Sequence, residues 1–146
     1  MDPGDITELN QLAYRYAYAV DTCDTGLFKD VFASDGRLCS YNPGEEEPFS
    51  DLRGSEEMAV IPATMQDMFK ATAHMMTNHM VFVTGDTASG NLLCTARHLL
   101  TDGGSVLNVH IRYEDEYVRV DGQWKILHRH IRFLWTERSE SSDNRF

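Results

Sequence analysis

Six histidines carry the widest choice of acid–base chemistry in this sequence: His74, His79, His98, His110, His128 and His130. A histidine beside an apolar cavity, oriented by a buried carboxylate, can take a proton from carbon and return one to a leaving oxygen. Asp21 is the most suitable carboxylate, because it lies at the edge of an apolar helical face and would be costly to bury without a partner. The simpler alternatives are that each histidine is a hydrogen-bonded structural side chain and that Asp21 caps a helix end or lies in solvent.

A metal site is a more specific alternative, but the spacing of the histidines does not favour it. His128 and His130 alternate on one strand and could reach a single ion, but no third ligand is implied near them. The sequence also has no glycine-rich phosphate loop, nucleophile elbow or paired Cys/His motif. We therefore expect neither a metal ion nor an organic cofactor.

Composition limits the class of protein. A chain of 146 residues is long enough for one domain with a core and a small cavity. The net charge of −10, from 13 Lys+Arg and 23 Asp+Glu, argues against nucleic acid and anionic membranes as partners. No run approaches membrane-spanning length. Cys23, Cys39 and Cys94 are odd in number and widely spaced, and no leader precedes them, so we expect free thiols in a reducing cytoplasm.

The first helix is expected to position Asp21. Asp5 followed by Glu8 is a capping-box arrangement, which predicts that this helix begins near residue 5. Asp21 then falls at the edge of the apolar band and faces a partner further along the chain. The band recurs with the helical period and consists of Leu9, Leu12, Ala13, Tyr16, Ala17 and Val20.

Two further helices are expected before the main sheet. Asp24 can cap a short helix over residues 25–32. Ser55, followed by two glutamates, can open a helix over residues 55–72. Pro62 must kink that helix or break it into two pieces, because proline removes a backbone donor and clashes with the preceding turn.

Alternating segments predict the strands. Residues 35–42 are expected to form a strand after a turn at Asp35 and Gly36, and residues 43–54 a polar loop. Four longer alternating segments, separated by Gly- and Asp-containing turns, predict an antiparallel meander. They are residues 74–84, 87–101, 105–120 and 123–134. Helices followed by a long curved sheet indicate an α+β fold in which the helices pack on one sheet face.

Side-chain alternation assigns the histidines to sheet faces. His98 shares its parity with small residues and is expected to point inward, where they leave space. His74 and His79 fall on opposite faces of the preceding strand, and the pattern leaves open which face is the inner one. The residues expected to share a face with His74 are Met76, Asn78, Met80 and Phe82.

The remaining histidines belong to the last two strands. His110 lies opposite the apolar set of its strand, which predicts an outer face or a subunit contact. The residues that share this face are Arg112, Glu114 and Glu116. His128 and His130 alternate with apolar residues and are expected on the same face as Trp124 and Arg132.

Three segments, in this order and spacing, resemble one known family: "YRYAYAVDTCDTGLFKDVFASDGRL", "ATAHMMTNHMVFVTGDTASGNLLCTARHLL" and "EDEYVRVDGQWKILHRHIR". They are similar to the SnoaL-like branch of the nuclear-transport-factor-2-like superfamily, in a single domain at residues 1–137 with a flexible tail at 138–146. The resemblance implies a cone-shaped curved sheet, antiparallel or mixed, that N-terminal helices close around a deep pocket. Enzymes of the family include scytalone dehydratase, bile-acid 7α-dehydratase, hexachlorocyclohexane dehydrochlorinase and polyketide cyclases.

The resemblance also implies catalytic residues. Asp21 matches the helix-one aspartate that orients a catalytic histidine in several of these lyases, and His74 matches that histidine. Tyr16 is similar to an aromatic pocket residue of the dehydratases. Tyr41 lies where scytalone dehydratase and the bile-acid enzyme place a tyrosine, and His98 stands at the spacing of a second histidine in scytalone dehydratase.

The same resemblance implies a substrate-binding wall. Val20 departs from the family pattern, because scytalone dehydratase has a second tyrosine there. Arg132 resembles a last-strand arginine of the bile-acid enzyme if one residue of slippage is allowed. The wall expected beside these two residues consists of Phe28, Met65, Phe69, Met76, Leu92, Cys94 and Tyr113.

The function that this implies is a cofactor-independent lyase or isomerase of the dehydratase type. Its substrate would be a mostly apolar small molecule such as a polyketide, terpenoid or steroid-like intermediate. His74 would be the general base and Asp21 would hold its tautomer, while Tyr41, Tyr16 or His98 would polarise a carbonyl or protonate the departing group.

Two alternatives remain open at this point. One is cyclisation or epoxide opening in the same pocket. The other, from a different class, is a non-catalytic ligand-binding or assembly protein, since small subunits of aromatic-ring dioxygenases share this fold. In either case the long outer face predicts a homodimer or homotrimer.

Overall fold

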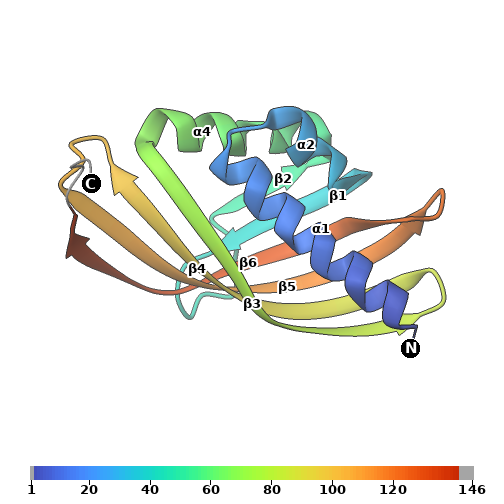
Figure 1. Ribbon diagram of the computed structural model, residues 1–146. Coiled ribbons are helices and arrows are strands. Elements are labelled where there is room, and N and C mark those ends of the chain that lie inside the picture. The colour runs from blue at the N-terminus through green and yellow to red at the C-terminus, as the bar shows by residue number, and fades with distance from the viewer. Residues whose placement is uncertain (1, 142–146) are drawn as a thin grey trace.

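The computed structural model describes residues 2–141, and in it helices cover one face of a six-stranded mixed sheet (Figure 1). The helices are α1 (Pro3–Asp21), α2 (Thr25–Asp30), α3 (Gly54–Met58) and α4 (Val60–Met68). The strands are β1 (Phe32–Tyr41), β2 (Ser50–Arg53), β3 (Phe69–Thr84), β4 (Thr87–Leu100), β5 (Ser105–Val120) and β6 (Gln123–Glu140). The predicted α+β fold class is confirmed.

The sheet has the strand order β2-β1-β6-β5-β4-β3. Strands β3 to β6 form the predicted antiparallel meander, whereas β1 lies parallel to β6. The predicted turn at Asp35 and Gly36 lies inside β1, where the pairing with β6 shifts register. The prediction of a loop over residues 43–54 is also wrong in part, because β2 pairs with β1 there. An ion pair between Arg37 and Asp51, at 2.8 Å, joins these two strands.

Helix α1 begins before the predicted position. Asp2 caps it by accepting a hydrogen bond from the backbone N–H of Gly4 at 2.8 Å. Asp5 accepts hydrogen bonds from Nε1 of Trp124 at 3.0 Å and from Nη2 of Arg119 at 2.9 Å. The predicted capping box is therefore wrong, and Asp5 instead ties the helix to β5 and β6.

The second and third predicted helices differ in outcome. Asp24 caps α2 as predicted, by accepting a hydrogen bond from the backbone N–H of Leu27 at 3.0 Å. The predicted helix over residues 55–72 consists of α3 and α4, which are separated at Ala59. Pro62 lies in the first turn of α4, where a missing N–H costs least. Because α4 ends sooner than predicted, β3 also begins sooner.

A bulge in β3 reverses the predicted sheet faces. The pairing with β4 shifts register just before Met80, and Asn78 there has a φ of 54°. An extra residue moves every following side chain to the other face. His79 therefore shares the inner face with His74, while Met80 and Phe82 are exposed, contrary to the predicted alternation.

A second bulge, in β6, also exchanges the inner and outer faces of the strand. Where β5 pairs with β6, the register makes Leu127 an extra residue. Trp124, which precedes it, is buried in the core. His128 and His130, which follow it, face outward, so the predicted shared face with Trp124 is wrong. His110 lies on this outer face, as predicted.

The core lies between α1 and the inner face of the sheet, and at one end it contains a charged pair. The Arg129 side chain is fully buried, and its Nε and Nη2 donate to Asp115 at 2.8 and 2.7 Å. The guanidinium carbon lies 4.2 Å from the ring centres of both Tyr16 and Tyr113. A buried charge is tolerated when it is paired and hydrogen-bonded. Packed side chains thus fill this part of the space beneath α1.

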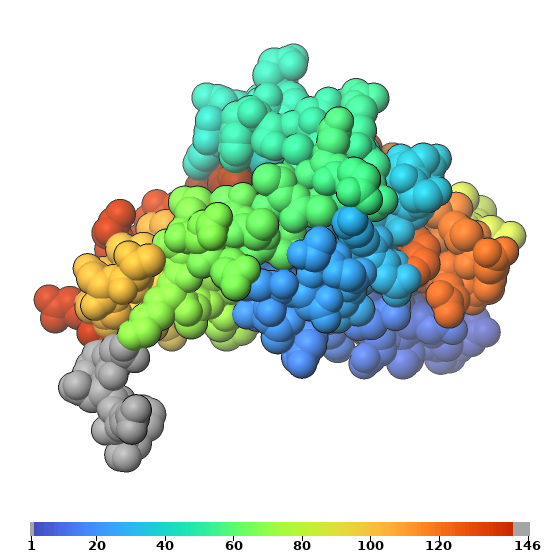
Figure 2. Space-filling model, turned by 90° about the horizontal axis from the view of Figure 1, so that it is seen from above, coloured from blue at the N-terminus to red at the C-terminus, as the bar shows by residue number. Residues whose placement is uncertain are grey.

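Seen from above, α1 and α4 lie side by side over the middle of the sheet, and the ends of the long strands extend past them on both sides (Figure 2). Strand β6 runs to Glu140, so residues 138–140 of the predicted tail belong to the sheet. The backbone N–H of Ser141 donates to the carbonyl oxygen of Gly104 at 3.0 Å, and residues 142–146 of the predicted tail lie outside the described residues. Within residues 2–141, no helix combines the length and apolar composition needed to cross a membrane.

Candidate active site

The last residue of α1 meets β3 at the centre of the site. Oδ1 of Asp21 lies 2.7 Å from Nδ1 of His74, and Oδ2 accepts a hydrogen bond from the backbone N–H of His74 at 2.9 Å. Thr72 donates a further hydrogen bond to Oδ1 at 2.9 Å. The hydrogen bond expected between Asp21 and His74 is therefore present. It forms because α1 ends beside the open edge of β3, whose free backbone N–H needs an acceptor.

The hydrogen bond fixes which nitrogen of His74 carries the proton. An ionised carboxylate only accepts, so Nδ1 of His74 must donate, and the neutral ring keeps its lone pair on Nε2. Burial raises the pKa of the Asp21 carboxyl, but the hydrogen bonds from His74 and Thr72 outweigh it, and the pKa lies below its usual value. The His74 side chain is 7% exposed and that of Asp21 is 25% exposed. The arrangement is suited to a general base.

His98 adds a second imidazole to the same face. Its ring centre lies 5.5 Å from that of His74, at an interplanar angle of 84°. Nδ1 of His98 donates to the carbonyl oxygen of Leu107 at 3.2 Å, which again leaves the lone pair on Nε2. Burial, and after it the positive charge that His74 can carry, lower the pKa of His98. The inward direction predicted for His98 is confirmed by its 6% exposure.

A hollow of about 250 Å³ opens beside Asp21 between α1, α4 and the start of β3. Of the predicted wall residues, Met65 and Phe69 line it, together with Thr72. The ring of Phe69 also packs on His98, with the two ring centres 4.5 Å apart. The hollow therefore reaches the carboxylate of the pair, and Phe69 lies at the contact between this hollow and the histidines.

The other predicted wall residues of the inner face are packed in the core. Val20, Phe28, Leu92, Cys94 and Tyr113 are each 2% exposed or less, and Met76 packs against them. The ring centre of Tyr16 lies 5.3 Å from that of Phe28 and 5.8 Å from that of Tyr113. Burial raises the pKa of the Tyr16 hydroxyl. The structure thus places Tyr16 beside the buried arginine pair.

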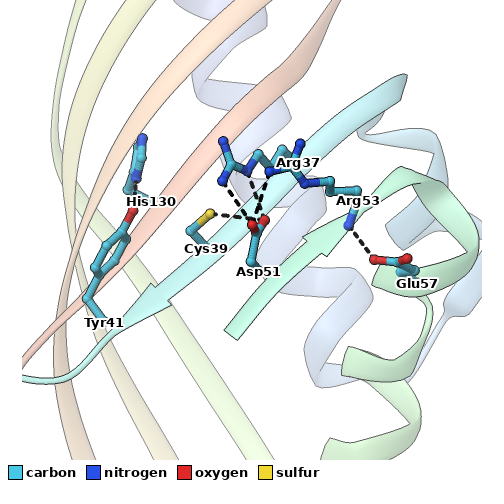
Figure 3. A network of polar contacts seen from close by, with 7 residues as sticks. All are labelled: Arg37, Cys39, Tyr41, Asp51, Arg53, Glu57 and His130. Carbon is cyan, nitrogen blue, oxygen red and sulfur yellow. Dashed lines mark hydrogen bonds and ion pairs between the residues drawn. The ribbon is translucent and has the colours of Figure 1, made fainter. Parts of the chain in front are cut away.

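Tyr41 and Arg132 lie on the outer face, apart from Asp21 and His74. The two residues are paired in register, and the neighbouring pair that faces the core is Ser40 with Ile131. The Tyr41 hydroxyl lies 2.7 Å from Nδ1 of His130 (Figure 3). The guanidinium of Arg132 lies 4.3 Å from the centre of the Tyr41 ring and also binds Glu114. The two residues predicted for the pocket are thus on the wrong face, because strand alternation turns them outward.

The outer face has its own polar network (Figure 3). Asp51 accepts two hydrogen bonds from Arg37, at 2.8 and 2.9 Å, and lies 3.4 Å from Sγ of Cys39. The hydrogen bonds from Arg37 hold the pKa of Asp51 far below its usual value. On the same face the rings of His128 and His130 lie in contact with centres 3.9 Å apart, tilted at 37° to each other. Across residues 2–141, no group of three or more histidine, cysteine or carboxylate side chains is placed to hold a metal ion.

Sequence reasoning missed Thr72. The predicted helix over residues 55–72 included it, and only the earlier start of β3 places Thr72 two residues before His74 on the same sheet face. The sequence also left the face of His79 open, and the structure places its Nδ1 2.8 Å from Oδ1 of Asn10 and its Nε2 3.0 Å from the hydroxyl of Tyr117. No signal in the alternation could reveal His79 as inward-facing, since the bulge that turns it follows no sequence period.

The sequence matches the family model described as the SnoaL-like domain over residues 4–130. The chain belongs to the SnoaL-like domain family. Uncharacterized proteins of Mycobacterium tuberculosis and Mycobacterium bovis are 37% identical to this SnoaL-like chain over 134 residues, which are 86% of this chain and 82% of theirs. The predicted resemblance to the nuclear-transport-factor-2-like superfamily is confirmed.

Solved structures share the fold of this SnoaL-like chain. A putative scytalone dehydratase from Novosphingobium aromaticivorans is 22% identical, with a TM-score of 0.80 over 97% of this chain and 95% of its own. A putative aromatic ring hydroxylase from the same organism is 26% identical, with a TM-score of 0.82 over 97% and 96%. A hexachlorocyclohexane dehydrochlorinase from Novosphingobium barchaimii is 19% identical, with a TM-score of 0.77 over 98% and 94%.

Proposed function

We propose that this SnoaL-like protein is a cofactor-independent lyase or isomerase in which His74 is the general base. The observation that carries the proposal is the hydrogen bond from Nδ1 of His74 to Asp21, at 2.7 Å. It leaves a lone pair on Nε2, and Asp21 stabilises the positive charge that the ring acquires on accepting a proton. A carboxylate that is hydrogen-bonded to an imidazole in this way allows the imidazole to accept and return a proton.

The reaction balances without a cofactor. Nε2 of His74 takes a proton from a carbon of the substrate, and the electron pair of that C–H bond forms a double bond to the adjacent carbon. In an elimination the leaving group departs from that adjacent carbon with its own electron pair, and the proton on His74 is returned to it. In an isomerisation the adjacent carbon already shares a double bond with a third carbon, the π electron pair of that bond moves to the third carbon, and the third carbon receives the proton from His74. Both routes leave the ring neutral again.

Two kinds of support favour this reaction class. The solved structures with the same fold include proteins described as a putative scytalone dehydratase and a hexachlorocyclohexane dehydrochlorinase, both named for eliminations. Met65 and Phe69 line one part of the hollow beside Asp21 and can contact the apolar part of a polyketide, terpenoid or steroid-like intermediate, while Gln66, Lys70 and Thr72 give the rest of the lining polar groups. Cyclisation and epoxide opening would use the same base.

His98 is the residue best placed to assist. Its ring is next to that of His74, and its Nε2 carries a lone pair that can receive and return a proton. Tyr41 is held on the outer face by His130, and Tyr16 packs beside Arg129. We therefore assign the helping role to His98 ahead of either tyrosine.

The test is a screen in deuterium oxide. Hydroxylated and carbonyl-containing polyketide, terpenoid and steroid compounds are incubated with the protein and followed by NMR and mass spectrometry. We expect one class to eliminate a leaving group or to exchange carbon-bound hydrogen for deuterium, and His74→Ala to abolish both. His110→Ala, on the outer face, is the matched control and should keep them. Binding of compounds without turnover or exchange would contradict the proposal.

A second candidate function is an assembly subunit without chemistry of its own. The observation in its favour is the fold shared with a protein described as a putative aromatic ring hydroxylase, at 26% identity. Such a subunit would bind a larger oxygenase chain, whereas an enzyme would turn over substrate alone. Activity of the purified chain in the screen above would exclude this candidate.

We also propose that the chain forms a homodimer or homotrimer in the cytoplasm, through the outer sheet face. That face carries His110, whose ring stacks on Trp135 and whose Nε2 lies 2.9 Å from Oε1 of Glu137, and Trp135 is 54% exposed. Arg112, Glu114 and Glu116 lie on the same face. Light scattering at tens of micromolar should report a multiple of the 16.6 kDa chain, and a monomer would contradict it.

A further inference from the structure

Thr72 is a polar residue of the inner face that the proposed reaction does not use. It lies on β3, is paired in register with His98 on β4, and shares its face with His74. Its hydroxyl donates a hydrogen bond to Oδ1 of Asp21 at 2.9 Å. Thr72 thus contacts the carboxylate of the pair directly and the imidazole only through it.

Two donors compete for one oxygen of Asp21. Oδ1 accepts from Thr72 at 2.9 Å and from Nδ1 of His74 at 2.7 Å, while Oδ2 accepts from the backbone N–H of His74 at 2.9 Å. An oxygen whose negative charge is partly satisfied by one donor binds a second donor less strongly. The hydroxyl therefore weakens the hold of Asp21 on the protonated ring.

The carboxylate does not depend on Thr72 for its orientation. The backbone N–H and the ring of His74 engage the two oxygens of Asp21 separately, so these two contacts already fix the carboxylate plane. Removal of the hydroxyl should leave Asp21 in place with one competing donor fewer. The predicted consequence is a stronger pair between Asp21 and the charged form of His74.

We propose that Thr72 is a positioning residue that acts through Asp21: it shares Oδ1 with Nδ1 of His74 and so limits how strongly the carboxylate holds the protonated ring. A base that is held protonated cannot take a proton from carbon, so a limit on the strength of the pair keeps His74 available. The catalytic meaning of this role rests on the proposed function. The effect on the ring is a property of the resting protein and needs no substrate.

The test is an NMR titration of the His74 ring in labelled protein. Thr72→Val keeps the shape of the side chain and removes its hydroxyl, and it should raise the midpoint of ring protonation by about half a pH unit, the scale of one hydrogen bond. Thr72→Ser restores the donor and should restore the midpoint. Thr95→Val, the same change on β4 at the opposite face, should leave the midpoint unchanged.

Two results would overturn the proposal. An unchanged midpoint in Thr72→Val would mean that the hydroxyl does not influence the ring, and a lower midpoint would mean that Thr72 serves only to hold the pair together. If the amide spectrum shows that Thr72→Val is unfolded, Thr72→Ala gives the same readout with less side-chain volume. Failure to find any enzymatic activity would count against the proposed function and would leave the titration result as it is.

Discussion

His74 and His98 lie on the inner face of the sheet, and His128 and His130 lie on its outer face. Burial lowers the pKa of His98, His128 and His130 alike, so burial alone does not distinguish the two faces. The hydrogen-bond partners of the Nδ1 atoms distinguish the two faces. On the inner face they are a carboxylate and a carbonyl, which only accept, and Nε2 is left with its lone pair. On the outer face Nδ1 of His130 meets the Tyr41 hydroxyl, which can donate or accept. An acceptor-only partner thus fixes the tautomer of these two inner rings, but it does not by itself define a base, because Nε2 of His110 on the outer face also meets a carboxylate, that of Glu137.

The carboxylates of the two faces also differ in the groups that donate hydrogen bonds to them. Asp51 on the outer face is bound twice by Arg37, a side chain that stays charged at any relevant pH. The donors to Asp21 are a hydroxyl, a backbone N–H and His74 itself. The charge of Asp51 is therefore neutralised permanently, whereas that of Asp21 is available when the imidazole becomes protonated.

The largest expected effect tests the inner pair directly. His74→Ala should lower turnover by roughly 10²–10⁴-fold with the fold intact, as expected for the loss of a positioned general base. His130→Ala is the matched change on the outer face and should leave turnover within about twofold. The measurement is kcat on the substrate found in the screen, with circular dichroism to confirm folding. Near-normal turnover in His74→Ala would move the base to His98.

The next effect concerns the tautomer that Asp21 imposes. In Asp21→Asn the amide nitrogen can donate to Nδ1 of His74 and the amide oxygen can accept from the backbone N–H, so the proton of the neutral ring should move from Nδ1 to Nε2. Turnover should fall by roughly 10²-fold or more, with little change in ligand affinity. Nitrogen NMR shifts of the His74 ring report the tautomer. An unchanged tautomer with lost activity would contradict this explanation.

A smaller effect is expected on the pH dependence of stability, through the outer-face carboxylate Asp51. Asp51 has a pKa lowered by Arg37, so its stabilisation is complete above its unfolded pKa of about 4 and is lost as pH falls toward the lower folded pKa. Asp51→Asn should therefore lower the melting temperature by roughly 2–4 °C at pH 7 and by less below pH 4, on the scale of a partly exposed ion pair.

The control for this pH effect is Glu47→Gln, an exposed residue in the loop between β1 and β2. It should leave the melting curve unchanged at both pH values. A melting-temperature loss in Asp51→Asn that stayed constant from pH 7 to pH 3 would show that the lost packing, and not the charge of Asp51, is responsible.

The smallest effect is expected for Tyr41→Phe. This change removes the hydroxyl that meets Nδ1 of His130, which should cost about 1 kcal/mol of unfolding free energy, the scale of one hydrogen bond. Turnover should change by less than about twofold, because the outer face is separated from His74 by the sheet. A large loss of turnover at normal stability would place Tyr41 in the reaction, as the family resemblance implied, and would remove the distinction between the two faces.

Much of the fold follows from local patterns. The apolar band of α1 and the cap at Asp24 come from residues close in sequence, and so do the turns of the β3 to β6 meander. Strand β2 escaped prediction because its four residues gain their pairing from β1 and lie within a turn-rich segment. The capping box at Asp5 failed because Trp124 and Arg119, distant in sequence, compete for the same carboxylate.

By itself the sequence determined that an acid at the end of α1 needed a partner, since burying an unpaired carboxylate is costly, and family resemblance pointed to His74. Only the tertiary structure decided which other side chains join that pair. Bulges at Asn78 and Leu127 each add one residue to a strand, and with a side-chain period of two a single residue exchanges the inner and outer faces. Whether a strand accepts a bulge depends on the neighbour to which it is hydrogen-bonded, and that neighbour is fixed only when the sheet assembles.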